Sequence, residues 1–329
     1  MDFRHKRDKD LRKEARKLGL RGYSSLNKAQ LIEYLSNEIL LAEDSENFGG
    51  TQENRGLVSL SEEADRLPKS SPTSVVYPTV NQILGGDCLK ILPHFTDGGF
   101  DCCIADPPFN MSKKKGLGWA FSSHITMEAQ WDMFTKDEYF QFTLDWIQEV
   151  KRVVKTNGNI FIFGSFHSIF TIGFILQNVL NLRIITQIVW YKPNAQPTIT
   201  CRMFTESTEF IIWAVNNEKQ KAKNWTFNYQ AMKAMNNNKQ MRNMWEIPLT
   251  KKSERRYGNH PSQKPEALIE RLVLAGTNEG DMILDPFSGT GTTGVIAEKH
   301  KRKWVMIEKE ESYNLIAQRR FEDLWTTVQ

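Results

Sequence analysis

Short apolar segments alternate with amphipathic segments along the chain from about residue 79 to its end. The apolar segments have the length and content of buried strands, and they span residues 82–86, 100–105, 160–163, 184–191, 209–215, 282–285 and 303–308. Between them, apolar residues recur at helical spacing in residues 139–153, 265–276, 291–299 and 311–324. This alternation predicts an α/β fold with a mostly parallel, doubly wound sheet.

One predicted helix carries its own boundary signals. Thr135 and Glu138 have the T-x-x-E spacing of a capping box, which predicts a helix that begins just after Thr135. The Asn157-Gly158 pair predicts the end of that helix, because both residue types tolerate a left-handed backbone. The stretch 216–258 has no clear period and is polar with scattered aromatic residues, so we predict an inserted lobe there.

The first 78 residues differ from the rest. Apolar stripes within residues 10–40 predict a helix, a turn between Gly19 and Gly22, and a second helix. This basic run resembles the SAP and Rho-N-terminal type of module, so residues 1–41 are predicted to be a small all-helical unit that binds nucleic acid. A plain oligomerisation hairpin is the alternative. Residues 42–78 have the composition of a flexible polar linker, which leaves 79–329 as the main domain.

Composition excludes several classes of protein. The charged N-terminus has no apolar signal region, and the longest apolar stretch, 160–180, is interrupted by polar residues and glycines. We therefore expect a cytoplasmic protein with no membrane span. The cysteines show no C-x-x-C spacing, so neither a metal site nor a disulfide is expected; they are Cys88, Cys102, Cys103 and Cys201.

The net charge of +4 is too small to identify a partner, but the basic residues are clustered. Besides the first 28 residues, the clusters are Lys113, Lys114 and Lys115, then Lys251 and Lys252 with Arg255 and Arg256, and then Lys299, Lys301, Arg302 and Lys303. Each cluster alone is typical of a solvated face. Together they favour a nucleic-acid partner.

One loop follows the predicted strand 282–285 and has the sequence D-P-F-S-G-T-G-T-T from Asp285. Its small residues let a ligand approach the backbone closely, and the helix after it offers free amide groups. Glu308 ends the next predicted strand, where an acidic side chain can accept hydrogen bonds from ribose hydroxyls. A nucleotide-like cofactor is therefore expected, whereas the missing G-x-x-x-x-G-K-[ST] pattern argues against a nucleotide triphosphatase.

A second loop, Asp106-Pro107-Pro108-Phe109, follows the predicted strand 100–105. The prolines fix the backbone, so the Asp106 carboxylate and the Pro107 carbonyl can face one place. Two such acceptors can grip the exocyclic amine of a base and make its lone pair available for attack. Phe109 offers a flat face on which an extruded base can stack.

These two loops, in this order, resemble the β-class amino-methyltransferases of DNA. The resemblance covers roughly residues 82–320 and includes H-P-S-Q-K-P from His260 and G-D-C-L-K-I-L from Gly86. It implies a Rossmann-like methyltransferase sheet, S-adenosylmethionine as cofactor and transfer to adenine N6 in double-stranded DNA. The region "CRMFTESTEFIIWA" is similar to that of enzymes from restriction-modification systems that read GATC, with GANTC enzymes second.

The resemblance also implies which residues form the site. The catalytic residues would be Asp106, Pro107, Pro108 and Phe109. The cofactor would be bound by Asp87, near its adenine, by Lys264, near its methionine part, and by Asp285, Phe287, Ser288, Gly289, Thr290, Gly291, Thr292 and Glu308. His260 is expected to be structural, because methylation of an amine needs no base before attack.

Contacts to DNA are expected from basic residues outside these motifs. The candidates are Lys113, Lys114, Lys115, Lys239, Arg242, Lys251, Lys252 and Arg255, with 216–258 as the target-recognition region. Residues 111–131 are predicted to form either a mobile flap over DNA or a surface loop. A cognate restriction endonuclease and a homodimer are further expected partners. The alternatives are an N4-cytosine DNA methyltransferase, whose relatives usually carry Ser in place of Asp106, and a non-catalytic DNA-binding protein with the same fold.

Overall fold

The computed structural model describes residues 9–10, 13, 80–110, 134–197, 202–258 and 260–327. The chain divides into two compact units, Met1–Val58 and Ser59–Gln329, and nearly all described residues belong to the second. The predicted module at 1–41 and the linker at 42–78 lie almost entirely outside the described residues, so both stay predictions. The predicted flap at 111–131 and Cys201 also lie outside the described residues.

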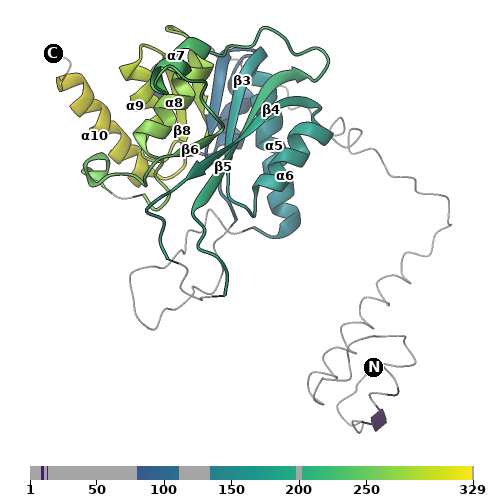
Figure 1. Ribbon diagram of the computed structural model, residues 1–329. Coiled ribbons are helices and arrows are strands. Elements are labelled where there is room, and N and C mark those ends of the chain that lie inside the picture. Colours follow the sequence, from purple (N-terminus) through teal and green to yellow (C-terminus); the bar gives the residue numbers. More distant parts are fainter. Residues whose placement is uncertain are drawn as a thin grey trace. The chain divides into compact units, whose positions relative to one another are not determined.

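The second unit is built on an eight-stranded sheet among the described residues, with the order β1-β8-β7-β2-β3-β5-β4-β6 (Figure 1). The strands are β1 (Gln82–Gly85), β2 (Phe100–Ala105), β3 (Val154–Gly164), β4 (Leu182–Tyr191), β5 (Thr208–Glu218), β6 (Met244–Glu246), β7 (Met282–Asp285) and β8 (Lys303–Glu308). All neighbours pair in parallel except β5, which is antiparallel to both β3 and β4. The predicted mostly parallel sheet is confirmed.

Helices cover both faces of the sheet, as a doubly wound fold requires. They are α4 (Cys88–Ile91), α5 (Lys136–Val153), α6 (Ile169–Phe174), α7 (Tyr229–Met235), α8 (Glu266–Gly276), α9 (Thr292–Lys299) and α10 (Glu311–Thr327), with short helical turns η2 (Leu92–His94), η4 (Ile175–Val179) and η5 (Lys252–Arg255). One core layer packs α5 and α6 on the sheet around Trp146. The other packs α8, α9 and α10 around Trp304, whose ring stacks on Phe321 at 4.4 Å between centroids.

Helix α5 begins as predicted but ends earlier. The Thr135 hydroxyl accepts a hydrogen bond from the Glu138 amide, and the Glu138 carboxylate accepts one from the Thr135 amide, which completes the capping box. The prediction that Asn157-Gly158 ends the helix is wrong, because β3 already begins at Val154. Asn157, with φ of 65°, lies where the register of β2 on β3 shifts, so this turn signal marks a bulge within a strand.

The stretch 216–258 is less irregular than its sequence suggests, because it contains α7 and the edge strand β6. Its first part lies at the edge of the sheet where the parallel strands begin: the Asn216 side chain donates to the carbonyls of Lys151 and Val154, and Arg183 donates to the Ala222 carbonyl. Strand β6 then runs parallel to β4 towards the opposite edge. Residues 247–258 therefore follow the carboxyl ends of the strands.

Other expectations about the chain can be compared with the described residues. Cys88, Cys102 and Cys103 are buried free thiols. Within the described ranges, no group of three or more His, Cys, Asp or Glu side chains is placed to hold a metal ion. None of the described helices combines the length and the apolar character of a membrane span.

Candidate active site

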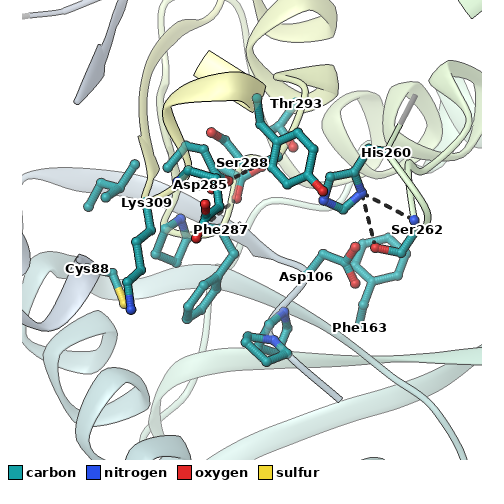
Figure 2. Close-up of a pocket in the computed structure, with 18 of the residues that line it drawn as sticks. Cys88, Asp106, Phe163, His260, Ser262, Asp285, Phe287, Ser288, Thr293 and Lys309 are labelled. Carbon is teal, nitrogen blue, oxygen red and sulfur yellow. Dashed lines mark hydrogen bonds between the residues drawn. The ribbon is translucent and has the colours of Figure 1, made fainter. Parts of the chain in front are cut away.

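The two loops selected from the sequence meet at the carboxyl edge of the sheet. Strands β2 and β7 are neighbours, with Cys103 opposite Leu284, so the loops that follow them start side by side. Asp106 follows β2, and Asp285 is the last residue of β7. Both side chains line one cavity of about 700 Å3, which Figure 2 shows in close-up. This is the position at which a doubly wound sheet binds its ligands.

Most of the residues selected for catalysis and cofactor binding line this cavity. They are Asp87, Asp106, Pro107, Pro108, Phe109, Lys264, Asp285, Phe287, Ser288, Gly289, Thr292 and Glu308. Thr290 and Gly291 are not among its lining residues. The Thr290 carbonyl accepts a hydrogen bond from the buried Arg320 guanidinium at 2.9 Å, which also donates to the Thr292 hydroxyl at 2.9 Å. These contacts hold the back of the loop against α10.

The loop after β7 owes its shape to two glycines. Gly289 and Gly291 have φ of 53° and 76°, a backbone region in which side chains are strained. A Cβ atom on Gly291 would also lie 2.9 Å from the Ala317 Cβ atom on α10. The Gly289 amide donates to one Glu308 carboxylate oxygen at 2.7 Å. Glu308 therefore ties the glycine loop to the end of β8 while it faces the cavity.

The Asp106 carboxylate is paired with the ammonium group of Lys264. Lys264 Nζ lies 2.7 Å from Asp106 Oδ2, and the Lys264 side chain is only 5% exposed. Burial raises the pKa of Asp106 and the positive charge of Lys264 lowers it; burial has the larger effect, so the pKa lies at about 6. The sequence resemblance placed Lys264 beside the cofactor. In the structure Lys264 lines the cavity and also forms an ion pair with the carboxylate of Asp106, the candidate catalytic residue.

A second carboxylate shares Lys264. Glu209, near the start of β5, has Oε2 at 3.3 Å from Lys264 Nζ and Oε1 at 3.2 Å from Lys192 Nζ. Burial alone would raise the pKa of Glu209, but the charges of Lys264 and Lys192 overcome this effect and lower it. Two lysines and two carboxylates thus alternate in a buried chain that ends at Asp106. Sequence analysis missed Glu209 and Lys192; a glutamate at the start of the apolar strand "TEFIIWAV" was the available signal.

Aromatic rings surround this charge chain. The Lys264 ammonium lies 5.2 Å from the centroid of the Phe109 ring and 5.3 Å from that of Phe163. Such distances allow cation-π attraction, which helps to keep the buried ammonium group charged. The ring of Phe163, on β3, also lines the cavity, although no role beyond a place in a buried strand was predicted for it.

His260 lies beside the glycine loop with its ring edge-on to Tyr313, at 4.3 Å between centroids. Its Nδ1 atom accepts a hydrogen bond from the Ser262 amide, drawn as a dashed line in Figure 2. Burial, together with the charge of Lys264, lowers the pKa of His260 to about 4. The imidazole is therefore neutral at physiological pH. These contacts agree with the structural role expected for it.

The cavity fits a polar cofactor at its glycine end. Ser288 is 8% exposed, and its Oγ atom has no hydrogen-bond partner among the described residues although it lines the cavity. Burial also raises the pKa of Asp285 to about 7 and raises that of Glu308. An unsatisfied hydroxyl and two carboxyl groups with raised pKa values are suited to ligand hydroxyls and amines. In the same loop, Phe287 offers an apolar wall that packs edge-on against Trp146.

The basic residues expected to contact DNA have different surroundings. Lys251 and Lys252 are exposed, and they lie in the chain just before Glu254. The Glu254 carbonyl accepts a hydrogen bond from the side-chain amide of Gln263 at 2.9 Å, and Gln263 directly precedes Lys264, so the two lysines lie near the site. Lys239 and Arg242 are exposed just before β6, and Arg255 is half-buried. The lysines at 113–115 lie outside the described residues.

Comparison with known proteins identifies the family. The family model described as DNA methylase, N6_N4_Mtase, matches residues 100–319, a span that includes both loops, the chain of charges and the glycine turn. The chain belongs to the N6/N4 DNA methylase family. The predicted membership of the amino-methyltransferases of DNA is therefore confirmed.

Curated relatives of this DNA methylase are Type II methyltransferases. M2.DpnII of Streptococcus pneumoniae is 40% identical over 242 residues, which cover 73% of this chain and 89% of that protein. M2.LlaDCHI of Lactococcus lactis subsp. cremoris is 40% identical over 251 residues, covering 75% and 92%. The aligned regions thus include almost all of the relatives but only about three quarters of this methylase.

Solved structures agree with the fold of the methylase. The M1.HpyAVI–SAM complex has a TM-score of 0.53 at 29% identity and covers 73% of this chain and 98% of its own. The cytosine-N4-specific PvuII DNA methyltransferase has a TM-score of 0.59 at 17% identity, covering 77% and 92%, which shows a common fold alone. The predicted Rossmann-like methyltransferase sheet is confirmed. The cofactor predicted from the sequence, S-adenosylmethionine, is the ligand named in the first of these structures.

Proposed function

We propose that this DNA methylase transfers a methyl group from S-adenosylmethionine to N6 of adenine in double-stranded DNA, as the modification enzyme of a restriction-modification system. The observation that supports this most directly is the ion pair between Asp106 and the buried Lys264, in the same cavity as the glycine loop. The Type II relatives support the biological setting. GATC is the target expected from the sequence.

Some residues of the cavity would bind the cofactor and others would bind the target base. Ser288, Glu308 and the turn at Gly289 would hold the cofactor, which supplies an electrophilic methyl group when it is bound. Asp106 would accept a hydrogen bond from the adenine amine. Lys264 contacts Oδ2, which leaves Oδ1 as the acceptor for the amine. Because Lys264 keeps this buried group ionised near neutral pH, the amine meets an acceptor throughout the reaction.

Asp106 also provides a destination for the proton that the amine must lose after it gains the methyl group. A carboxyl with a pKa of about 6 can take up that proton and release it to water near neutral pH. The adenine would be extruded from the duplex and stack on Phe109, whose ring lines the same cavity. The half-buried Asp106 side chain, 22% exposed, is accessible to such a base.

Sequencing of methylated bases in DNA from a methylation-free host that expresses the protein tests the proposal. N6-methyladenine within one short sequence supports it and identifies the target, whereas N4-methylcytosine would assign the protein to the other branch of the family. D106A should bind cofactor and DNA but lose roughly a thousandfold in rate, by analogy with the loss of a transition-state contact. D106N retains shape and one acceptor, so it separates the charge of the carboxylate from its position.

The cytoplasmic location, a homodimeric state and a partner endonuclease belong to the same proposal. An endonuclease that cuts the identified sequence and is blocked by its methylation would support the partnership. Sedimentation of the purified protein with and without DNA would test the homodimer. The exposed Lys251 and Lys252 near the site support contact with the phosphate backbone of DNA.

A further inference from the structure

The connection between β4 and β5, residues 192–207, leaves the sheet at the same edge as the catalytic loops. Strand β5 is antiparallel to both β3 and β4, so β4 runs in the same direction as β3 and β2. The connection that follows β4 therefore starts at the carboxyl edge, where Asp106 follows β2. The structure describes residues 192–197 and 202–207 of this connection.

The base of this connection is fixed firmly to the site. The Lys192 amide donates to the Ser207 carbonyl at 2.7 Å, which closes the connection, and Lys192 Nζ pairs with Glu209 at 3.2 Å. The Asn194 side chain accepts a hydrogen bond from the Leu249 amide at 2.9 Å. Because Glu209 also contacts Lys264, Lys192 at the base of the connection is joined to Asp106 through three successive ion pairs.

Two described residues of the connection, Met203 and Phe204, present apolar side chains to solvent. Phe204 is 97% exposed, the highest value among the exposed large hydrophobic residues of the described part, and Met203 beside it is 54% exposed. Arg202, which precedes them, is also exposed. An extended apolar pair next to an arginine, at the edge that receives DNA, resembles in its chemistry the wedges that proteins insert between base pairs.

The dimensions allow Phe204 to reach the space from which a base has left. Strand β5 is two places from β2 in the sheet, which corresponds to roughly 10 Å at about 4.8 Å for each strand spacing. Phe204 is five residues before Glu209, so the chain between them spans at most about 18 Å. Phe204 therefore lies at most about 18 Å from Glu209, the residue that contacts Lys264 in the pocket, and this bound is compatible with a ring that enters the base stack beside the pocket.

We propose that Phe204 is a wedge that enters the DNA base stack as the target adenine turns into the Asp106 pocket, with Met203 packing against the neighbouring base pair and Arg202 contacting a phosphate. This inference rests on the proposed function, since only a base that leaves the duplex needs its place filled. The ring of Phe204 replaces the stacking contacts that the departing adenine gives up, and so it lowers the cost of the opened duplex.

The test compares F204A with the wild-type protein on two duplexes that carry the target sequence identified by sequencing. In one duplex the target adenine is paired normally; in the other it faces an abasic site, which weakens its stacking and pairing in advance. We expect F204A to methylate the normal duplex at about one tenth of the wild-type rate or below. On the abasic duplex its rate should recover to near that of the wild type. F204W should keep most of the rate on both.

A direct measurement of extrusion accompanies the rates. With 2-aminopurine at the target position, binding of the wild-type protein should raise its fluorescence strongly, and binding of F204A should raise it much less. F170A removes another phenylalanine that is 77% exposed, on α6, and serves as the matched control. It should match the wild type in every measurement.

Three results would overturn the proposal that Phe204 acts as a wedge. Wild-type behaviour of F204A on the normal duplex would show that the ring has no role in extrusion, and an equal loss on both duplexes would place its effect in the pocket. A change in sedimentation with unchanged rates would assign Phe204 to a contact between two copies of the chain. If the wild-type protein methylates no adenine, the proposed function itself fails, which is a separate result because it needs no variant.

Discussion

Replacing Lys264 by Met should move the pH at which the enzyme loses activity. Methionine has a similar length and no charge, so K264M removes the ammonium group that lies 2.7 Å from Asp106 Oδ2. Two unit charges 3 to 4 Å apart attract by roughly 4 to 6 kcal/mol at an effective dielectric constant of about 20, and one pKa unit corresponds to about 1.4 kcal/mol. Water that enters the space offsets part of this loss, so we expect the pKa of Asp106 to rise by at least about one unit.

The sign of the effect follows from the form of Asp106 that works. The amine of adenine needs the ionised carboxylate as acceptor, so the rate falls as the pH drops through the pKa of Asp106, about 6 in the wild type. In K264M this fall should begin at higher pH, so the variant loses roughly tenfold near neutral pH and recovers in mild alkali. The assay is the rate of methyl transfer with saturating cofactor, measured across the pH range in which the protein stays folded.

The control for K264M is K155M, which removes a lysine paired with Asp101, near the start of β2, the strand that Asp106 follows. Its pH profile should overlay that of the wild type. If K264M lowers the rate by the same factor at every pH, then Lys264 acts by shape or by cofactor contact, and the electrostatic reasoning fails. Circular dichroism at each pH excludes loss of fold as the cause of a shift.

Three further predictions test neighbouring groups. In E209Q the fall in rate should move to lower pH, opposite to K264M, because the charge of Glu209 raises the pKa of Asp106; a shift to higher pH would contradict this sign. G291A should lower the free energy of unfolding by about 1 to 3 kcal/mol, because its Cβ atom would lie 2.9 Å from that of Ala317 in a strained backbone. Thermal melts measure this loss, and G280A, whose Cβ atom would meet no other atom, is the control for the steric contact. S288A should leave the melting temperature unchanged but weaken cofactor binding roughly 3- to 10-fold in calorimetry, since the Oγ atom has no protein partner to lose; equal affinity would remove Ser288 from the cofactor site.

The strands and the two loops could be predicted from the sequence because their signals are local. An apolar run such as 282–285 can be buried on both faces only as an interior strand, and β7 and β8 lie where the pattern predicted them. Parallel strands all end at one edge, which is why the two loops that follow such strands, at Asp106 and Asp285, lie at the same edge of the sheet. The structure makes β2 and β7 direct neighbours.

The charge chain could not be predicted, because its members are far apart in the sequence. Lys264 had a role only through its motif, and Glu209 and Lys192 had none. They meet since β5 runs antiparallel, which brings the start of β5 to the edge where β2 and β4 end. The direction of β5 also explains why the polar stretch that follows it, predicted from the sequence to be one inserted lobe, begins at the opposite edge of the sheet.

The sequence by itself determined the class of fold, the family and the two loops that carry the chemistry, because hydrophobic periodicity and glycine or proline turns act over a few residues. Only the tertiary structure decided which charge faces Asp106, which loop residues point into the cavity and which turn away, and that Phe204 stands exposed beside the site. Those properties depend on strand order and direction, and these are set by packing between segments that are not neighbours in the sequence, such as β2 and β7.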